Sequence, residues 1–371
     1  MRPLPGPRTI MRVSTALLAT VACCAPALAS ASTPDHRHHH HQLPWQVLCA
    51  KERAKRPHLK CDLDHRPGAA ARLAPMQDPT LTQYSTPTSP SGPTGITAGP
   101  DNALWFTENY NSAIGRLTTG GTITEYSTPT SDSQPADITT GSDGALWFTE
   151  SQGNNIGRIA TDGTVTEYAL PNAGEQPWGI TAGPDGALWY TAIGTNAIGR
   201  ITTAGVITEY PIPTANAYSV SIVTGPDGAL WFTEPFGGNL GRITTGGVIT
   251  EVPTTATGTE PILLTNGPDG NLWFTDGAGY IGKATTSGTV TEYPVSGSYT
   301  YPWGIITGSD GQLWFADSGT TQLRSIDTSG TVTGTFDLPD TGANPLELAT
   351  GSDGNLWMTE NGVDKIAKIV L

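Results

Sequence analysis

Basic residues are scarce over most of this sequence. Residues 77–371 carry 8 Lys/Arg against 29 Asp/Glu, a net charge of −21, whereas residues 1–76 carry 11 Lys/Arg and 4 Asp/Glu, a net charge of +7. Nucleic acids and anionic membranes are bound through clusters of basic side chains. We therefore expect neither as a partner of the acidic part. We expect a monomer that binds a small molecule, a glycan or a protein.

A run long enough to span a membrane is also missing. The apolar stretch from Val13 to Leu28 is too short and too interrupted to cross a bilayer. It follows three arginines and ends in small residues, the three-part pattern of an export signal. We predict a signal peptide over residues 1–31 and a secreted, periplasmic or extracellular protein. Acylation of Cys23 or Cys24 would instead give a lipid-anchored protein.

Cysteine is rare, and only Cys49 and Cys61 remain after the predicted cleavage. Two nearby cysteines in an oxidising compartment predict a disulfide. They lie in residues 32–78, which we interpret as a His-rich, partly disordered leader. Its histidines are His36, His38, His39, His40, His41, His58 and His65. Their spacing from the cysteines does not match the usual zinc sites, although a His-rich tract can bind transition metals loosely.

The remainder of the chain is a repeat. A Gly-x-Asp-Gly or Gly-x-Asp-Asn turn followed by Leu-Trp recurs every 41–43 residues. The seven tryptophans are Trp105, Trp147, Trp189, Trp231, Trp273, Trp314 and Trp357. A fixed period of about 40 residues is typical of repeat architectures.

Each repeat contains four short runs of β-branched and aromatic residues bounded by Gly, Pro and Asn, and no window has the helical period. In the third repeat these runs fall at 177–182, 187–191, 196–201 and 206–210. Four short antiparallel strands form a propeller blade. The last repeat lacks its fourth strand, and residues 80–87 supply a matching one. We predict an all-β fold over residues 79–371, a seven-bladed β-propeller whose last blade is closed by the N-terminal strand.

Residues present in every repeat are expected to be structural. Seven equivalent tryptophans predict a core ring in each blade. The repeated basic residues are Arg116, Arg158, Arg200, Arg242 and Lys283. We expect them to pair with the repeated acids Glu125, Glu167, Glu209, Glu251 and Glu292 at the surface.

Acidic residues also follow each tryptophan by three positions, with Ala192 the one gap. They are Glu108, Glu150, Glu234, Asp276, Asp317 and Glu360. If they meet around one mouth of the propeller, they either bind a divalent cation such as Mg²⁺ or Ca²⁺, or form a solvated rim. Glu360, Asp317 and Asp276 are the candidate metal ligands.

Function in a propeller is expected where one blade departs from the others. Trp178 and Trp303 occupy the entries to the first strands of the third and sixth repeats, and Tyr299 and Tyr301 are close to Trp303. Aromatic rings on a propeller mouth predict stacking against a flat ligand. The alternative is that these rings fill the mouth by packing.

The sequence resembles the virginiamycin B lyase (streptogramin lyase) family, most clearly in the segments 179–189, 196–202 and 206–214. The resemblance covers residues 80–371. It implies a seven-bladed propeller that opens the ester of type B streptogramins by magnesium-assisted elimination. It also implies histidines after proline at the last two blade entries, one of them the base. This chain has Trp303 and Leu346 there, with Asn344 where the family has an acid.

The resemblance assigns Glu360 a place close to a family metal ligand. All seven histidines of this chain lie at or before His65, so the predicted propeller has none. Elimination needs a base that can take up a proton near neutral pH. Glu347 and Glu360 are the remaining candidates for that role, provided that their pKa values are raised.

Two functions follow from these features. The first is an exported propeller that binds a ligand or partner on its loop face and lacks the elimination activity. The second is a magnesium-dependent carbon-oxygen lyase, or a lactone hydrolase, acting on a macrocyclic ester. An extracellular interaction module is a third interpretation, based on the general use of the fold as a binding platform.

Overall fold

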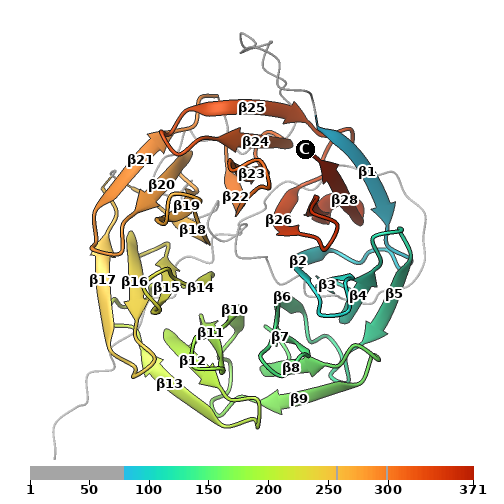
Figure 1. The fold of residues 1–371 in the computed structure, drawn as a ribbon. Coiled ribbons are helices and arrows are strands. Elements are labelled where there is room, and N and C mark those ends of the chain that lie inside the picture. The colour runs from blue at the N-terminus through green and yellow to red at the C-terminus, as the bar shows by residue number, and fades with distance from the viewer. Residues whose placement is uncertain (1–78, 256–257, 298–299) are drawn as a thin grey trace, which may run out of the picture. The chain divides into compact units, whose positions relative to one another are not determined.

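The computed structural model describes residues 79–255, 258–297 and 300–371. These residues form seven sheets, each of four antiparallel strands, placed side by side around one axis (Figure 1). The predicted all-β, seven-bladed β-propeller is therefore confirmed. The predicted signal peptide, the leader with Cys49 and Cys61, and Tyr299 lie outside the described residues. Among the described residues, no helix has the length and apolarity needed to cross a membrane.

The strands of each blade follow one another from the axis outward, except in the last blade (Figure 1). Blade 1 has β2 (Pro93–Ala98), β3 (Leu104–Glu108), β4 (Ala113–Leu117) and β5 (Ile123–Ser127). Blade 2 has β6 (Pro135–Thr140), β7 (Leu146–Glu150), β8 (Asn155–Ile159) and β9 (Val165–Ala169). Blade 3 has β10 (Pro177–Ala182), β11 (Leu188–Ala192), β12 (Ala197–Ile201) and β13 (Ile207–Pro211). Blade 4 has β14 (Ile222–Thr224), β15 (Leu230–Glu234), β16 (Asn239–Ile243) and β17 (Ile249–Pro253).

Blade 5 has β18 (Pro261–Asn266), β19 (Leu272–Asp276), β20 (Tyr280–Ala284) and β21 (Val290–Pro294). Blade 6 has β22 (Pro302–Thr307), β23 (Leu313–Asp317), β24 (Gln322–Ile326) and β25 (Val332–Asp337). Blade 7 has β26 (Pro345–Thr350), β27 (Leu356–Glu360), β28 (Lys365–Val370) and the N-terminal β1 (Thr80–Ser85), with a 3₁₀ turn at Asn361–Val363.

The N-terminal strand closes the ring as predicted. β1 pairs with β28 in antiparallel register from Thr80↔Val370 to Ser85↔Lys365. The Asp364 carboxylate then accepts hydrogen bonds from the backbone N–H groups of Ser91 and Gly92 at 2.9 and 3.0 Å, which ties blade 7 to the entry of blade 1. Pairing the N-terminal strand with the C-terminal strand in one blade closes the ring between the first and last blades.

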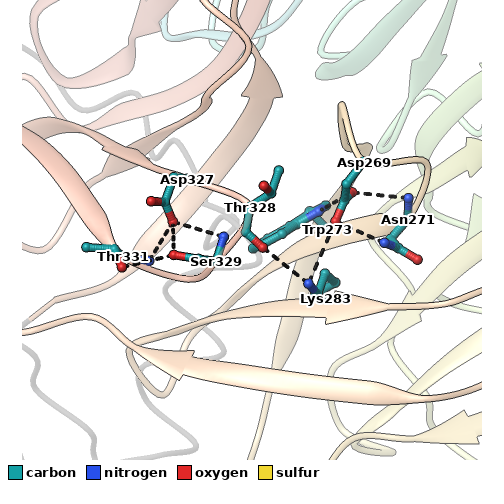
Figure 2. A network of polar contacts seen from close by, with 8 residues as sticks. All are labelled: Asp269, Asn271, Trp273, Lys283, Asp327, Thr328, Ser329 and Thr331. Atoms are coloured by element: carbon teal, nitrogen blue, oxygen red, sulfur yellow. Dashed lines mark hydrogen bonds and ion pairs between the residues drawn. The ribbon is translucent and has the colours of Figure 1, made fainter.

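The repeated tryptophans are fully buried, which confirms their predicted core role. In blade 3 the indole N–H of Trp189 donates to Asp185 Oδ1 at 3.1 Å, and Tyr210 stacks on the ring at 5.6 Å. Arg200 lies over the same ring and donates to Asp185 Oδ2 at 2.7 Å. Figure 2 shows the equivalent contacts in blade 5, where Lys283 reaches Asp269 beside Trp273 and also donates to the carbonyl of Thr328 in the next blade.

The predicted pairing of the repeated arginines with the repeated glutamates is therefore wrong. Arg200 lies opposite Trp189 in the ladder, so both side chains project from the same face of the sheet. Glu209 lies opposite Gly199, and neighbouring residues of a strand project from opposite faces. The aspartate of each Gly-x-Asp-Gly turn is on the arginine's side and takes the pair.

Candidate functional site

The innermost strands enclose a cavity of about 150 Å³ on the axis of the ring. Most of its lining is aliphatic, from β10, β14, β18, β22 and β26. Asp137 and Glu347 are its two acidic residues, contributed by β6 and β26. Both follow the proline at a blade entry by two positions, where the strand is bulged and a side chain can turn toward the axis.

Asp137 and Glu347 each bridge two blades. Asp137 accepts hydrogen bonds from the N–H of Ile138 at 2.7 Å and from that of Ile180, in the next blade, at 2.8 Å. Glu347 likewise accepts from the backbone of Ile96 in blade 1. Burial raises the pKa of Asp137, and burial together with the charge of Asp137 raises the pKa of Glu347. The two side chains thus satisfy N–H groups of the inner strands, and their burial favours the protonated form of each carboxyl group.

The sequence analysis missed Asp137. The equivalent position is glycine at Gly95, Gly179 and Gly304, so an acidic residue there breaks the repeat. That departure was the available signal.

The blade entries are closed by packed side chains. Leu346, which stands where the resemblance predicts the family's base, is 1% exposed. Trp303 is 2% exposed with its ring 6.2 Å from that of Tyr301, and Trp178 is 7% exposed. Buried rings offer little open face, which favours the alternative that they fill the mouth. A ligand-binding role for Trp178, Trp303 and Tyr301 stays a prediction.

The structure separates the two candidate bases. Glu347 lines the axial cavity, whereas Glu360 lies at the end of β27, where Oε2 accepts a hydrogen bond from Gln83 Nε2 of β1 at 2.6 Å. Burial raises the pKa of Glu360 to about 7. Glu360 is thus enclosed within its own blade.

The three candidate metal ligands also lie in three different blades. Asp317 forms a buried ion pair with Arg324, whose Nη1 is 3.2 Å from Asp317 Oδ2. Asp276 Oδ1 accepts from the N–H groups of Glu260 and Ala278 at 3.0 and 2.7 Å. Over residues 79–255, 258–297 and 300–371, no three His, Cys, Asp or Glu side chains converge as a metal ion would require. Their role in metal binding stays a prediction.

The acids at the ends of the second strands do not form the expected solvated rim. All six are 0% exposed. Each is held inside its own blade, as Glu108 is by the Asn111 amide, which donates to Glu108 Oε2 at 2.9 Å. The rim interpretation is wrong because residues at a strand end still alternate between the two faces, and the acids point into the blade.

Comparisons with known proteins agree with the seven-bladed fold. The model of the "Virginiamycin B lyase family" matches residues 69–262 and 208–371. The structure of virginiamycin B lyase from Staphylococcus aureus is 36% identical, with a TM-score of 0.76, and the match covers 79% of this chain and 100% of that chain. A catalytically inactive histidine-to-alanine variant of that enzyme, solved with quinupristin, is 35% identical at the same coverage and TM-score.

A curated virginiamycin B lyase from Saccharopolyspora erythraea is 49% identical over 41 residues. That match spans 11% of this chain and 14% of the relative's length.

Proposed function

The chain belongs to the virginiamycin B lyase family, and from this premise we propose that it is an exported propeller that binds a ligand on its loop face without catalysing streptogramin elimination. The observation that carries the proposal is the buried Leu346 at the position of the family's base, in a chain with no histidine after His65. An aliphatic side chain cannot accept a proton, and losing a positioned base typically costs about 10²- to 10⁴-fold in rate.

Neither remaining carboxylate is well placed to replace the histidine. One Glu347 oxygen is engaged by the Ile96 backbone inside the axial cavity, and Glu360 is held by Gln83 inside blade 7. A general base must come within hydrogen-bonding distance of the substrate proton. Both groups would have to leave their present partners to do so.

Binding without catalysis has a parallel in a relative. The histidine-to-alanine variant of the Staphylococcus aureus enzyme is described as catalytically inactive and was solved with quinupristin. Removal of a histidine in that enzyme is therefore compatible with a bound ligand. We infer a ligand of related chemistry for this chain, a cyclic depsipeptide or another macrocyclic ester with aromatic groups.

The alternative is a magnesium-dependent carbon-oxygen lyase or lactone hydrolase. It is favoured by the raised pKa of Glu360, about 7, which suits a general base near neutral pH. The predicted Mg²⁺ or Ca²⁺ ligands do not fit a metal in their present arrangement. Arg324 already neutralises Asp317, and N–H donors occupy Glu360 and Asp276.

Export rests on the charged and apolar pattern of residues 1–31. Expression of the full chain with its native N-terminus, followed by mass spectrometry of the medium, tests it. A product beginning near residue 32 is expected, and an uncleaved cell-associated chain would contradict export.

The decisive experiment separates binding from turnover. The purified chain is incubated with quinupristin and Mg²⁺. Binding is followed by calorimetry and ring opening by mass spectrometry. We expect binding with no ring-opened product. Turnover that disappears in Glu360→Gln but persists in the surface variant Asp162→Asn would establish the alternative, and absence of both binding and turnover would reject this ligand class.

A further inference from the structure

Blade 1 brings two carboxyl groups into contact inside the sheet. Glu108 of β3 is 0% exposed, and its side chain is within hydrogen-bonding reach of half-buried Glu125 on β5. Thr88 donates to both Glu125 oxygens, from its N–H at 2.9 Å and its hydroxyl at 2.6 Å. Asn111 occupies Glu108 Oε2, and Glu108 Oε1 has no hydrogen-bond donor among the described residues. Three of the four oxygens are satisfied and the fourth faces a second acid.

Blade 2 repeats this arrangement. Asn155 donates to Glu150 Oε2 at 2.8 Å, while Glu150 Oε1 is buried without a donor in the described chain. Thr130 donates to Glu167 from its N–H and its hydroxyl at 2.8 and 2.7 Å. The Glu167 carboxyl group lies close enough to Glu150 to contribute to the raised pKa of Glu150.

Blade 4 has the same pair in Glu234 and Glu251. Asn239 donates to Glu234 Oε2 at 3.2 Å and Thr214 N–H to Glu251 Oε1 at 2.8 Å. Glu234 Oε1 is buried and lacks a donor within the described ranges. Blade 3 has a related pair by another route, because Ala192 replaces the strand acid and Glu175 from the preceding loop meets Glu209 instead.

Among the described residues, no basic side chain neutralises these pairs. Residues 79–371 contain eight Lys/Arg, and all eight form ion pairs with other acids. The other charged group that faces the blade 1 pair is Asp364, which is itself negative. Two contacting carboxylates without a cation cannot both stay ionised at low cost.

Blades 6 and 7 indicate what is required at this position. In blade 7, Gln83 replaces the outer-strand glutamate and donates its amide to Glu360 at 2.6 Å. In blade 6, Arg324 takes the position of the usual glycine and pairs with Asp317. Each of these blades supplies a permanent donor to the strand-end acid, whereas blades 1, 2 and 4 have a carboxyl group there.

A proton fits the gap better than a metal ion. The Thr88 and Asn111 groups around the blade 1 pair direct N–H and O–H hydrogens toward the carboxylates. The partial positive charge of these hydrogens would repel a cation placed beside them. One oxygen per pair remains open, and one shared proton satisfies it.

We propose that blades 1, 2 and 4 of the folded propeller each hold one proton between a buried and a half-buried glutamate, so that the ring is stabilised in mildly acidic solution and loosens as the pH rises. Blades 6 and 7, with Arg324 and Gln83, replace the proton by a fixed donor. Blades 1, 2 and 4 are then the blades in which a pair of glutamates makes stability depend on pH.

The direction of the effect follows from the pKa values. Burial, reinforced by the neighbouring Glu125, raises the pKa of Glu108 to about 8, and burial beside Glu167 and Glu251 raises those of Glu150 and Glu234 to about 8 and about 7. The ordinary glutamate value is 4.5. The folded chain therefore binds more protons than the unfolded chain between these values, and stability falls as the pH rises through that window.

The test is the melting temperature of the full chain between pH 5 and pH 9. Wild type should lose more than about 5 °C between pH 5 and pH 8. Seven carboxyl groups have raised pKa values, and the triple variant Glu108→Gln/Glu150→Gln/Glu234→Gln removes three of them. The fall should therefore shrink by about 40%. The exposed-acid variant Asp132→Asn/Asp162→Asn/Asp337→Asn should retain the wild-type fall.

Two further measurements keep the proposal decidable. Infrared spectra of wild type at pH 7 should contain the carbonyl band of protonated carboxylic acids, a readout that does not require the variant to fold. Absence of that band, or an unchanged fall in a folded triple variant, would overturn the proposal. So would a rise in wild-type melting temperature at pH 8 on adding Ca²⁺ or Mg²⁺ that the triple variant lacks, because the pairs would then be cation sites.

Discussion

Gln83 donates its side-chain amide to Glu360 at 2.6 Å, joining two residues that are 277 positions apart in the sequence. The same amide donates to Asp340 at 2.8 Å, and Lys365 lies beside both groups. Gln83 thus links β1 to the last blade through side-chain hydrogen bonds as well as through strand pairing. The equivalent residue in blade 1 is Glu125, so one amide distinguishes a fixed hydrogen bond from a shared proton.

Gln83→Glu should convert blade 7 into a proton-sharing blade. The new carboxylate would remove the amide donor from Glu360 and place a second negative charge beside it, which Lys365, now donating to Gln83 Oε1 at 3.3 Å, offsets only in part. We therefore expect the unfolding free energy to fall by about 1–3 kcal/mol at pH 8. The loss should be small at pH 5, where a proton can bridge the two groups. Chemical denaturation at both pH values measures this. Gln83→Met removes the donor without adding charge. Because the pKa of Glu360 is about 7, this loss should also be greater at pH 8 than at pH 5, but smaller at pH 8 than that of Gln83→Glu.

Asp364 is a second determinant of ring closure. Its carboxylate accepts two backbone N–H bonds and two from the hydroxyls of Ser89 and Ser91, and its φ is 54°. Asp364→Ala should lose about 2–4 kcal/mol, because buried donors are left unpaired and alanine disfavours positive φ. Asp364→Asn tolerates this backbone and keeps one acceptor, so it should lose about half as much. Equal losses of stability in both variants would contradict the role of the Asp364 carboxylate in ring closure.

The glycine opposite the blade aromatic should be intolerant of substitution. A Cβ at Gly115 would collide with the Phe106 ring, whereas one at Gly120 would have Thr118 Oγ1 as its nearest neighbour at 3.8 Å. We expect Gly115→Ala to lose more than about 3 kcal/mol and Gly120→Ala to change stability by less than about 0.5 kcal/mol. Urea denaturation of both variants measures this difference in stability.

The propeller could be predicted because its information is local and repeated. The 41–43-residue period, the turn glycines and the alternation within each run fix strand number and order without knowledge of any long-range contact. The closure by β1 was also visible, since residues 80–87 match a strand that the last repeat lacks. Strand bounds in the third repeat agree with the structure to within one residue.

The direction of side chains could not be predicted in the same way. The pairing of Arg200 with Asp185, in place of Glu209, depends on which face of β12 each residue occupies, and that depends on the register between strands. The burial of Glu108 has the same origin. Asp137 was missed because its position varies among the repeats, with Ser221, Leu263 and Glu347 in other blades, and the sequence does not show that this position faces the axial cavity.

The proposed loss of the catalytic base leads to the last prediction. If Leu346 occupies the catalytic position of the family, Leu346→His together with Asn344→Glu should introduce ring opening of quinupristin in the presence of Mg²⁺. A positioned base contributes about 10²- to 10⁴-fold, so the gain should be measurable by mass spectrometry even from a low background.

Leu348→His is the matched control. Leu348 is in the same strand and lines the axial cavity, and it is 9% exposed compared with 1% for Leu346. It should stay inactive. Equal activity in both variants would mean that any imidazole near the axis suffices, and no activity in a folded Leu346→His/Asn344→Glu chain that still binds quinupristin would mean that residues beyond the base position have also diverged. The first result would reject the assignment of position 346, and the second would place the functional difference in the surrounding blade entries, where Trp303 and Trp178 pack.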